Sequence, residues 1–249
     1  MSGERGLGRF GLALDVDGGG DYLRQAVEAE DLGYSAVWVL GGQLDTLDPL
    51  AGLVRATREV AVAPGRLFAG FGGLQARPVS ATREVLEGLD GRIPVSRRLL
   101  AALGPRKLDL ARDSAASAIT MLVTPEYTAR ARARLGPEAV LVVCQLVALD
   151  EDRSRAREAL RGPLGFLVGS EVTGYAANMR RMGFGEGDLD GFSDRLVDAV
   201  SSGGDAEVVL AGVRAHLEAG ADHVVLCAQS GGGRPGPIEL GRALAGDLT

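Results

Sequence analysis

The sequence is poor in the residues that usually build metal centres and disulfide frameworks. Its 249 residues include two cysteines and two histidines. Cys144 and Cys227 each lie in an apolar run of the kind that forms a strand, which favours buried free thiols. Two such cysteines make neither a metal site nor a disulfide framework. We therefore expect no bound metal and no disulfide.

Other absences narrow the class of protein. No apolar stretch approaches the roughly 18 residues that a membrane span needs, and the N-terminal residues MSGERGLGRF lack the apolar core of a secretory signal. The net charge of −6 argues against a general nucleic-acid binder, which would carry a basic surface. We expect a cytoplasmic protein with a small-molecule substrate and neither nucleic acid nor membrane as a partner.

Glycine is the residue in excess. It supplies 37 of the 249 residues, about twice the usual share of roughly 7%. No collagen-like period accompanies these glycines, so they are expected to serve turns and close backbone approaches. The hydrophobic content of 46% is ordinary for a globular domain, and the length matches one (β/α)8 barrel of roughly 250 residues.

Apolar runs and helical stripes alternate along the chain. This alternation predicts a parallel sheet with right-handed crossovers. A long helical stretch is expected around 151–202, with breaks at 162–163 and 183–187, and no change of composition divides residues 1–249 into two domains. We predict a TIM-barrel-like (β/α)8 fold that lacks one βα unit. The predicted strands span residues 10–16, 36–40, 67–71, 99–103, 116–123, 140–149 and 222–229.

The run after the fourth predicted strand is the best candidate for anion binding. Gly104 lets the backbone come close to a ligand, Pro105 opens a helix with free N–H groups, and Arg106 and Lys107 add positive charge. Such a helix start binds phosphate readily. The alternative is an ordinary strand-to-helix turn with a surface Arg–Lys pair.

Two further glycine groups follow predicted strands. Gly70, Gly72 and Gly73 would let a flat ligand approach the third strand, or they serve a turn. The glycines at 231–233 follow the last strand, where barrels often hold phosphate, although a flexible linker suits the same composition.

Neither histidine indicates a catalytic site. His216 lies on a predicted helix between charged neighbours and is expected to be solvated. His223 begins the last predicted strand and either points into a site or hydrogen-bonds with Asp222 at the strand entry. No Ser–His–Asp set, HExxH or Walker motif is present, so no catalytic residue is assigned.

Eight segments carry a family resemblance in order along most of the chain. They are EAEDLGYSAVWV (28–39), PGRLFAGFGG (64–73), RPVSATREVLEGLD (77–90), LLAALGPRKLDLA (99–111), LVTPEYTARARARLG (122–136), YAANMRRMGF (175–184), SDRLVDAV (193–200) and VRAHLEAGADHVVL (213–226). Together they resemble the luciferase-like monooxygenase superfamily, in particular the coenzyme F420 (deazaflavin)-dependent oxidoreductases of actinobacteria. The resemblance implies a barrel, a coenzyme at the carboxyl ends of the strands, hydride transfer to or from an organic substrate, and a homodimer. By position, Gly104, Pro105 and Arg106 match the turn that holds the coenzyme phosphate.

The chain departs from this family where the barrel keeps its chemistry. An acidic or histidine residue usual after the second strand is replaced at 40–42 by Leu-Gly-Gly, and the following βα unit is missing. The loop after Gly73 is short. The family's acid, histidine and tyrosine are replaced by Ala116, Ile119 and Met121. These losses favour either a lost cofactor or a pocket reused for other chemistry.

Three functions remain open at this point. The first is an F420-dependent oxidoreductase, with FMN as the alternative coenzyme, its phosphate at residues 104–106 and its ring against residues 70–73. The second is a cofactor-free cyclase or isomerase on the same scaffold, and the third is a non-catalytic barrel. Substrate-facing side chains are expected from Trp38, Met121, Gln145 and Tyr175.

Overall fold

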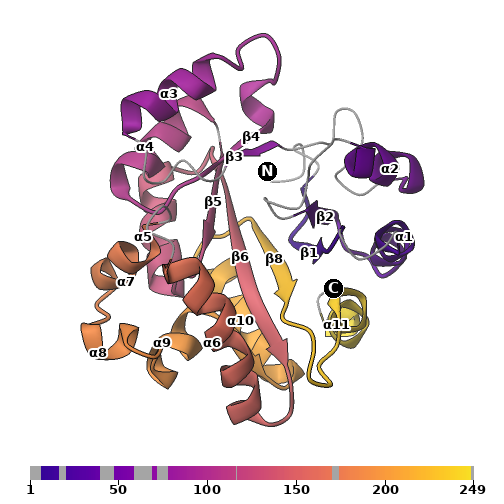
Figure 1. Ribbon diagram of the computed structural model, residues 1–249. Coiled ribbons are helices and arrows are strands. Elements are labelled where there is room, and N and C mark those ends of the chain that lie inside the picture. The colour runs from indigo at the N-terminus through magenta and orange to yellow at the C-terminus, as the bar shows by residue number, and fades with distance from the viewer. Residues whose placement is uncertain are drawn as a thin grey trace.

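The computed structural model describes residues 7–16, 21–39, 48–58, 69–71, 78–115, 117–169 and 174–247. Eight strands in these ranges form one parallel sheet (Figure 1). They are β1 (Phe10–Leu14), β2 (Ala36–Val39), β3 (Ala69–Phe71), β4 (Arg98–Ala101), β5 (Ser117–Met121), β6 (Val140–Leu149), β7 (Ser202–Gly204) and β8 (His223–Ala228).

The sheet follows a path of seven strands in the order β2-β1-β8-β6-β5-β4-β3. The predicted seven-stranded, TIM-barrel-like sheet is therefore confirmed. In the described part of the chain β2 and β3 do not pair with each other, so the curled sheet is a half-barrel. The two end strands, β2 and β3, are consecutive in the chain. The βα unit that the sequence analysis expects to be missing would lie between them in the sequence.

The eighth strand, β7, is not predicted from the sequence. It has only three residues, Ser-Gly-Gly, and lies at the end of a stretch expected to be helical. It pairs in parallel with Val147–Leu149 of β6, beyond the point where β5 ends its pairing. The long partner strand β6, rather than a local apolar pattern, therefore makes residues 202–204 a strand.

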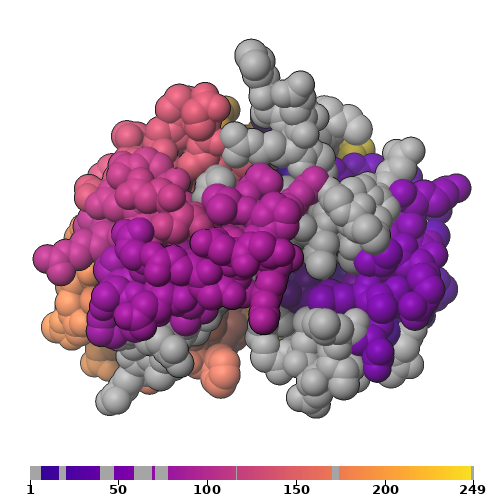
Figure 2. Space-filling view, turned by 90° about the horizontal axis from the view of Figure 1, so that it is seen from above, coloured from indigo at the N-terminus to yellow at the C-terminus, as the bar shows by residue number. Residues whose placement is uncertain are grey.

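Helices cover the sheet. They are α1 (Tyr22–Asp31), α2 (Asp48–Ala56), α3 (Val79–Glu87), α4 (Pro105–Ser114), α5 (Pro125–Leu135), α6 (Arg153–Gly169), α7 (Tyr175–Arg181), α8 (Glu186–Leu189), α9 (Asp194–Val200), α10 (Ala206–Glu218) and α11 (Pro237–Leu244). Figure 1 shows α1, α2 and α11 at the β1–β2 end of the sheet and α3, α4 and α5 at the β3–β5 end. Seen from above, the indigo surface of α1 and α2 and the purple surface around α3 stand on opposite sides of the molecule (Figure 2).

The helix break expected at residues 162–163 is wrong. Helix α6 continues through Pro163 to Gly169. An interior proline removes one backbone hydrogen bond and costs about 3 kcal/mol in a helix. Leu160 and Leu164 are fully buried on either side of it, and their burial offsets that cost because each large apolar side chain contributes about 1.5–3 kcal/mol.

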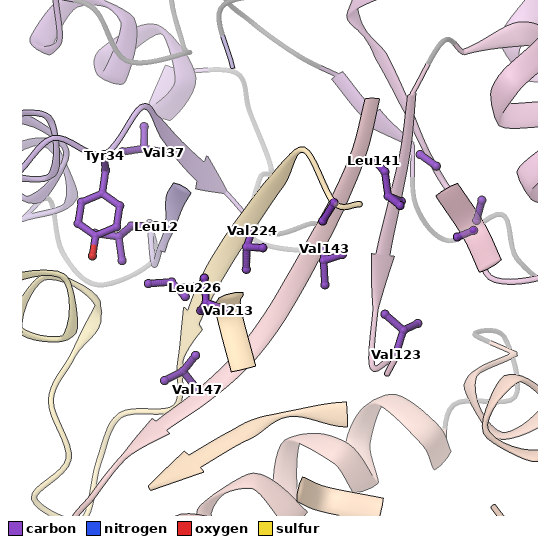
Figure 3. Close-up of a cluster of buried hydrophobic side chains, with 14 of the residues drawn as sticks. Leu12, Tyr34, Val37, Val123, Leu141, Val143, Val147, Val213, Val224 and Leu226 are labelled. Atoms are coloured by element: carbon purple, nitrogen blue, oxygen red, sulfur yellow. The ribbon is translucent and has the colours of Figure 1, made fainter. Parts of the chain in front are cut away.

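Alternate residues of the strands point to opposite faces of the sheet. On the outer face, Leu12, Val143 and Leu226 pack with Val213 of α10 in the larger core cluster (Figure 3). We call the opposite side the inner face. Its buried residues include Leu99, Cys144 and Val225, and they pack with side chains from α6, α7 and α9. Three helices of the predicted 151–202 stretch therefore contribute to the core of the inner face.

Candidate functional site

One part of the inner face is apolar but not fully buried. Five residues from four strands point to this face by their register, and a sixth, Tyr175, packs against it as the first residue of α7. Gly70 is exposed and the other five are half-buried. We call these six residues the inner strip: Trp38, Gly70, Ala101, Ile119, Met121 and Tyr175.

The inner strip brings together several residues that sequence analysis selects separately. Trp38, Met121 and Tyr175 are candidate substrate contacts, and Gly70 is a candidate ring contact. They lie on β2, β5, α7 and β3, yet share one face of the sheet. Met121 and Ala101 are the last residues of their strands, so the strip reaches the carboxyl edge where barrels place their sites. Gly72 and Gly73 lie outside the described residues.

Gln145 does not face the strip. It lies on the outer-face register of β6, is 3% exposed, and donates a hydrogen bond from Nε2 to Oγ of Ser202 at 3.1 Å. Its expected place among substrate contacts is corrected, because a one-residue change of position in a strand turns the side chain to the other face.

Tyr175 stands beside two buried thiols. Cys144 and Cys227 are free, lie on neighbouring strands and point to the inner face. A hydrogen bond with Cys144 and burial raise the pKa of the Cys227 thiol. Burial and these two sulfur groups raise the pKa of the Tyr175 phenol, which therefore stays neutral near pH 7. The prediction of buried free thiols is confirmed.

His223 is occupied by a structural contact. Trp38 donates from Nε1 to Nε2 of His223 at 3.0 Å, so the ring proton of His223 lies on Nδ1 and points to the carbonyl oxygen of Gly8, 2.5 Å away. Burial lowers the pKa of His223 to about 4. Of the two roles open to it, His223 takes a structural one, although its partners are Trp38 and Gly8 rather than Asp222.

His216 is also buried, which corrects the expected solvated position. It lies on α10, is 1% exposed, and places Nδ1 2.9 Å from Oγ1 of Thr128 on α5. Burial lowers its pKa to about 4. Charged neighbours in the sequence predicted exposure, but the packing of α10 against α5 decides the environment of this side chain.

The Gly104 turn lies where β4 ends and α4 begins. Gly104 is the N-cap and Pro105 the first helical residue. Arg106 is exposed, and in the described parts of the chain it has no ion-pair partner. A Cβ atom at Gly104 would lie 3.9 Å from Nη2 of Arg181, at the end of α7. The turn is therefore followed by one exposed arginine, Arg106, and lies close to the guanidinium of a second, Arg181. Sequence analysis misses Arg181, since nothing in its local pattern links it to Gly104.

Lys107 takes a different direction from Arg106. Its side chain is buried and its ammonium contacts Oγ1 of Thr82 on α3. Desolvation lowers the pKa of this ammonium. The group thus ties α4 to α3, so of the two basic side chains at the turn only Arg106 is open to a ligand.

The backbone just after β5 is strained. Leu122 follows Met121 directly and has a φ of 55° while its side chain is buried. An L residue in this left-handed region costs roughly 1–2 kcal/mol, and such residues cluster at functional sites. The strain lies at the carboxyl edge of the inner strip.

A second feature at the carboxyl edge is an open cleft of about 680 Å³ beside β6, β7 and β8. Its lining includes Gly232 and Gly233, which sequence analysis offers as phosphate-binding or linker residues. Three carboxylates also line it, those of Asp150, Glu151 and Asp205, against one guanidinium, that of Arg155. This negative excess favours no phosphate there.

The described residues contain no group of three or more His, Cys, Asp or Glu side chains that could hold a metal ion. Nor does any helix in them combine the length and apolar character of a membrane span.

The comparisons with known proteins find matches to this chain among solved structures. No protein-family model and no curated protein sequence matches it. An F420-dependent secondary alcohol dehydrogenase, solved with an F420–acetone adduct, superposes with a TM-score of 0.71 at 15% identity, over 96% of this chain and 97% of the other. The coenzyme F420-dependent tetrahydromethanopterin reductase of Methanopyrus kandleri gives 0.67 at 16% identity, over 96% and 97%.

A third similar structure extends the group to flavin. The oxygenating constituent of 3,6-diketocamphane monooxygenase from Pseudomonas putida, a type II Baeyer–Villiger monooxygenase solved with FMN, gives a TM-score of 0.59 at 14% identity, over 96% of each chain. This chain therefore has the luciferase-like barrel fold that these F420- and FMN-binding enzymes share, and the fold predicted from the resemblance is confirmed.

Proposed function

We propose that the chain is an F420-dependent oxidoreductase of the luciferase-like family that transfers hydride to or from a small organic substrate. FMN is the alternative coenzyme. The proposal rests on the closeness, along the chain, of the inner strip and the Gly104 turn at the end of β4. Ala101 of the inner strip ends β4, and the Gly104 turn with its two nearby arginines follows three residues later.

The residues present fit a coenzyme with a flat ring and a phosphate. Gly70 and Ala101 have little or no side chain and are not covered, so a ring could lie close to the backbone there. The N–H of Arg106 and the guanidinium groups of Arg106 and Arg181 offer donors and positive charge to a phosphate.

A bound coenzyme would supply the hydride chemistry, and the chain would supply binding and exclusion of water. The apolar side chains of Trp38, Ile119 and Met121 exclude water from the strip. The polar groups are the hydroxyl of Tyr175 within the strip and the thiols of Cys144 and Cys227 beside it. Burial lowers the pKa of His223 to about 4 and keeps it neutral, and its two ring nitrogens are taken up by Trp38 and Gly8, so it is not offered as an acid or a base.

A cofactor-free enzyme of the cyclase or isomerase type is the second candidate. One specific observation favours it: within the described strands, no inner-face position carries a charged side chain. Such an apolar surface could fold a hydrocarbon chain without any coenzyme. The arginine pair at the Gly104 turn favours the first candidate, because a hydrocarbon substrate has no charged group for the arginines to bind.

Coenzyme titration tests the first candidate. Purified protein is titrated with F420 and with FMN while absorption and the emission of Trp38, the only tryptophan, are recorded. We expect micromolar binding of one coenzyme, and a loss of tenfold or more in the double variant Arg106→Ala, Arg181→Ala.

A matched control separates a site effect from a charge effect. Arg24→Ala removes an exposed arginine on α1, far along the chain from the turn, and should leave coenzyme affinity unchanged. If neither coenzyme binds to folded protein, the oxidoreductase proposal fails and the cofactor-free candidate takes its place.

We also propose that the protein is a homodimer located in the cytoplasm. Among the described residues, β2 and β3 are the end strands of the half-barrel, and proteins normally pair or cover such edges. Phe166 on α6 is 82% exposed, and large exposed apolar side chains are common at contacts between subunits. Sedimentation at micromolar concentration should give twice the monomer mass, and a monomer would contradict the proposal.

A further inference from the structure

The inner strip presents an uncharged surface. Its members are apolar apart from the indole N–H of Trp38 and the hydroxyl of Tyr175. The indole N–H is already used, because it donates to His223. Asp15 directly follows β1, the strand beside β2, at the same carboxyl edge. The charge that this neighbouring strand end adds is therefore negative. A ligand on the strip meets no positive group from the described strands.

Tyr175 is the one hydroxyl in the strip. Among the described residues its oxygen has no hydrogen-bond partner, since its polar neighbours are the thiols of Cys144 and Cys227, which act on it only through their electrostatic field. Thiols are weak donors and weak acceptors. The phenol is therefore a neutral donor whose hydrogen bond is not yet made.

The surroundings limit what this donor can bind. Both thiols are at most 3% exposed and belong to the apolar core of the inner face. A carboxylate placed beside them would lose its hydration without meeting a cation of the described strands, which costs far more than one hydrogen bond returns. A neutral oxygen loses less hydration and can accept the phenol proton directly.

We propose that Tyr175 determines the ligand specificity of the inner strip: its hydroxyl donates a hydrogen bond to the single oxygen of an uncharged, otherwise apolar molecule such as a cyclic ketone. This inference rests on the proposed function in one respect, because it treats the inner strip as the substrate site. The family's own polar residues are replaced at Ile119 and Met121 of the strip, so Tyr175 on α7 supplies the hydroxyl from another element.

The test uses three probes of similar shape on the full chain without coenzyme. They are cyclohexanone, methylcyclohexane and cyclohexanecarboxylate at pH 7. The emission of Trp38 reports on the strip itself, since it is the only tryptophan and a member of the strip. Quenching of free N-acetyltryptophanamide by each probe is subtracted, so that only a saturable change counts as binding.

We expect cyclohexanone to bind at least tenfold more tightly than the carboxylate. Tyr175→Phe should weaken cyclohexanone about fivefold to tenfold, the value of one ordinary hydrogen bond, and leave methylcyclohexane unchanged. Tyr34→Phe is the matched control. It removes a hydroxyl that donates to the carbonyl oxygen of Gly241 at 3.1 Å, and Tyr34 packs in the outer-face cluster.

Three results would overturn the inference: equal cyclohexanone affinity in the wild type and Tyr175→Phe, tighter binding of the carboxylate, or no saturable change with any probe. Thermal unfolding of each variant shows that it is folded. Coenzyme titration of the same proteins separates the two proposals. If the protein selects the ketone but binds no coenzyme, only the oxidoreductase proposal fails. If it binds a coenzyme but Tyr175→Phe leaves ketone binding unchanged, only the inference about Tyr175 fails.

Discussion

The indole Nε1 of Trp38 donates to Nε2 of His223 across the strand that separates them. The two atoms are 3.0 Å apart, and β1 lies between β2 and β8. The crossing is possible because Gly11 of β1 has no side chain there. This contact spans 185 residues of sequence and joins the edge strand β2 to the centre of the sheet.

Gly11→Ala should destabilise the protein. An added Cβ atom would lie 2.6 Å from Nε2 of His223 and 2.7 Å from Nε1 of Trp38. Overpacking of this kind typically costs about 1–3 kcal/mol. Gly70→Ala is the control, since a Cβ atom at Gly70 meets no atom of the described residues within 4 Å. Urea unfolding measures both, and equal stabilities would show that the Trp38–His223 contact yields without cost.

The stability of the protein should fall as the pH is lowered from 7 to 5. Burial holds the pKa of His216 and of His223 near 4, whereas an unfolded histidine titrates near 6.5. Between these values the unfolded chain binds protons that the folded chain does not, so acid favours unfolding. Each histidine should remove about 2 kcal/mol at pH 5, from roughly 1.4 kcal/mol per pKa unit.

His216→Gln is the variant that checks this assignment. It should abolish about half of the change in unfolding free energy between pH 7 and pH 5, because His223 still titrates. Carboxylates such as Asp188, whose pKa Arg195 lowers, act mainly below pH 5 and are separable by the pH window. A wild-type stability that is flat from pH 7 to pH 5 would mean that neither histidine is buried in its neutral form.

Ser117→Ala should leave the protein as stable or make it more stable by up to about 1 kcal/mol. The hydroxyl of Ser117 is fully buried on β5 and has no hydrogen-bond partner among the residues that the structure describes, so its removal ends a desolvation cost. Thr120→Val on the same strand is the contrast, since Oγ1 of Thr120 donates to the carbonyl oxygen of Val142 at 3.2 Å. That variant should lose about 1 kcal/mol. A destabilised Ser117→Ala would indicate a partner for the hydroxyl.

Arg132→Ala should destabilise the protein by about 2–4 kcal/mol. Its guanidinium donates to the carbonyl oxygens of Gly136, Ala139 and Gly220 and pairs with the carboxylate of Asp222. This one side chain ties α5 to the entries of β6 and β8. Arg132→Lys should recover only part of the loss, because an ammonium cannot match the planar fork of donors.

Arg130→Ala, on the exposed side of the same helix, is the control for Arg132. Substitutions of exposed residues away from such contacts usually change stability by less than about 0.5 kcal/mol. Similar losses at the two positions, measured by urea unfolding, would mean that helix propensity rather than the carbonyl cluster accounts for the effect.

Strands with a strong local signal are predictable from the sequence. Val140–Leu149 is a predicted strand whose bounds match β6 in full, because an uninterrupted apolar run suits a strand covered on both faces. The start of α4 is equally clear, since a glycine followed by a proline marks the N-cap and the first helical residue. The resemblance to luciferase-like proteins rests on many such segments and leads to the observed fold.

The candidate site is only partly predictable. Trp38, Met121 and Tyr175 are selected from strand ends and a helical segment, and they do meet on the inner face. Gln145 fails the same reasoning, because the face on which a residue lies depends on strand register. Arg181 has no local signal at all. It reaches the Gly104 turn because α7 packs across the inner face, a contact between segments far apart in the chain.

The sequence by itself determined the alternation of strands and helices and the apolar character of the interior, because these follow from local pattern and residue type. The tertiary structure alone decided the short strand β7, the continuation of α6 through Pro163, the burial of His216 and the meeting of Trp38 with His223. Each of these depends on contacts between distant segments, and their packing energy outweighs the local preferences that a single sequence displays.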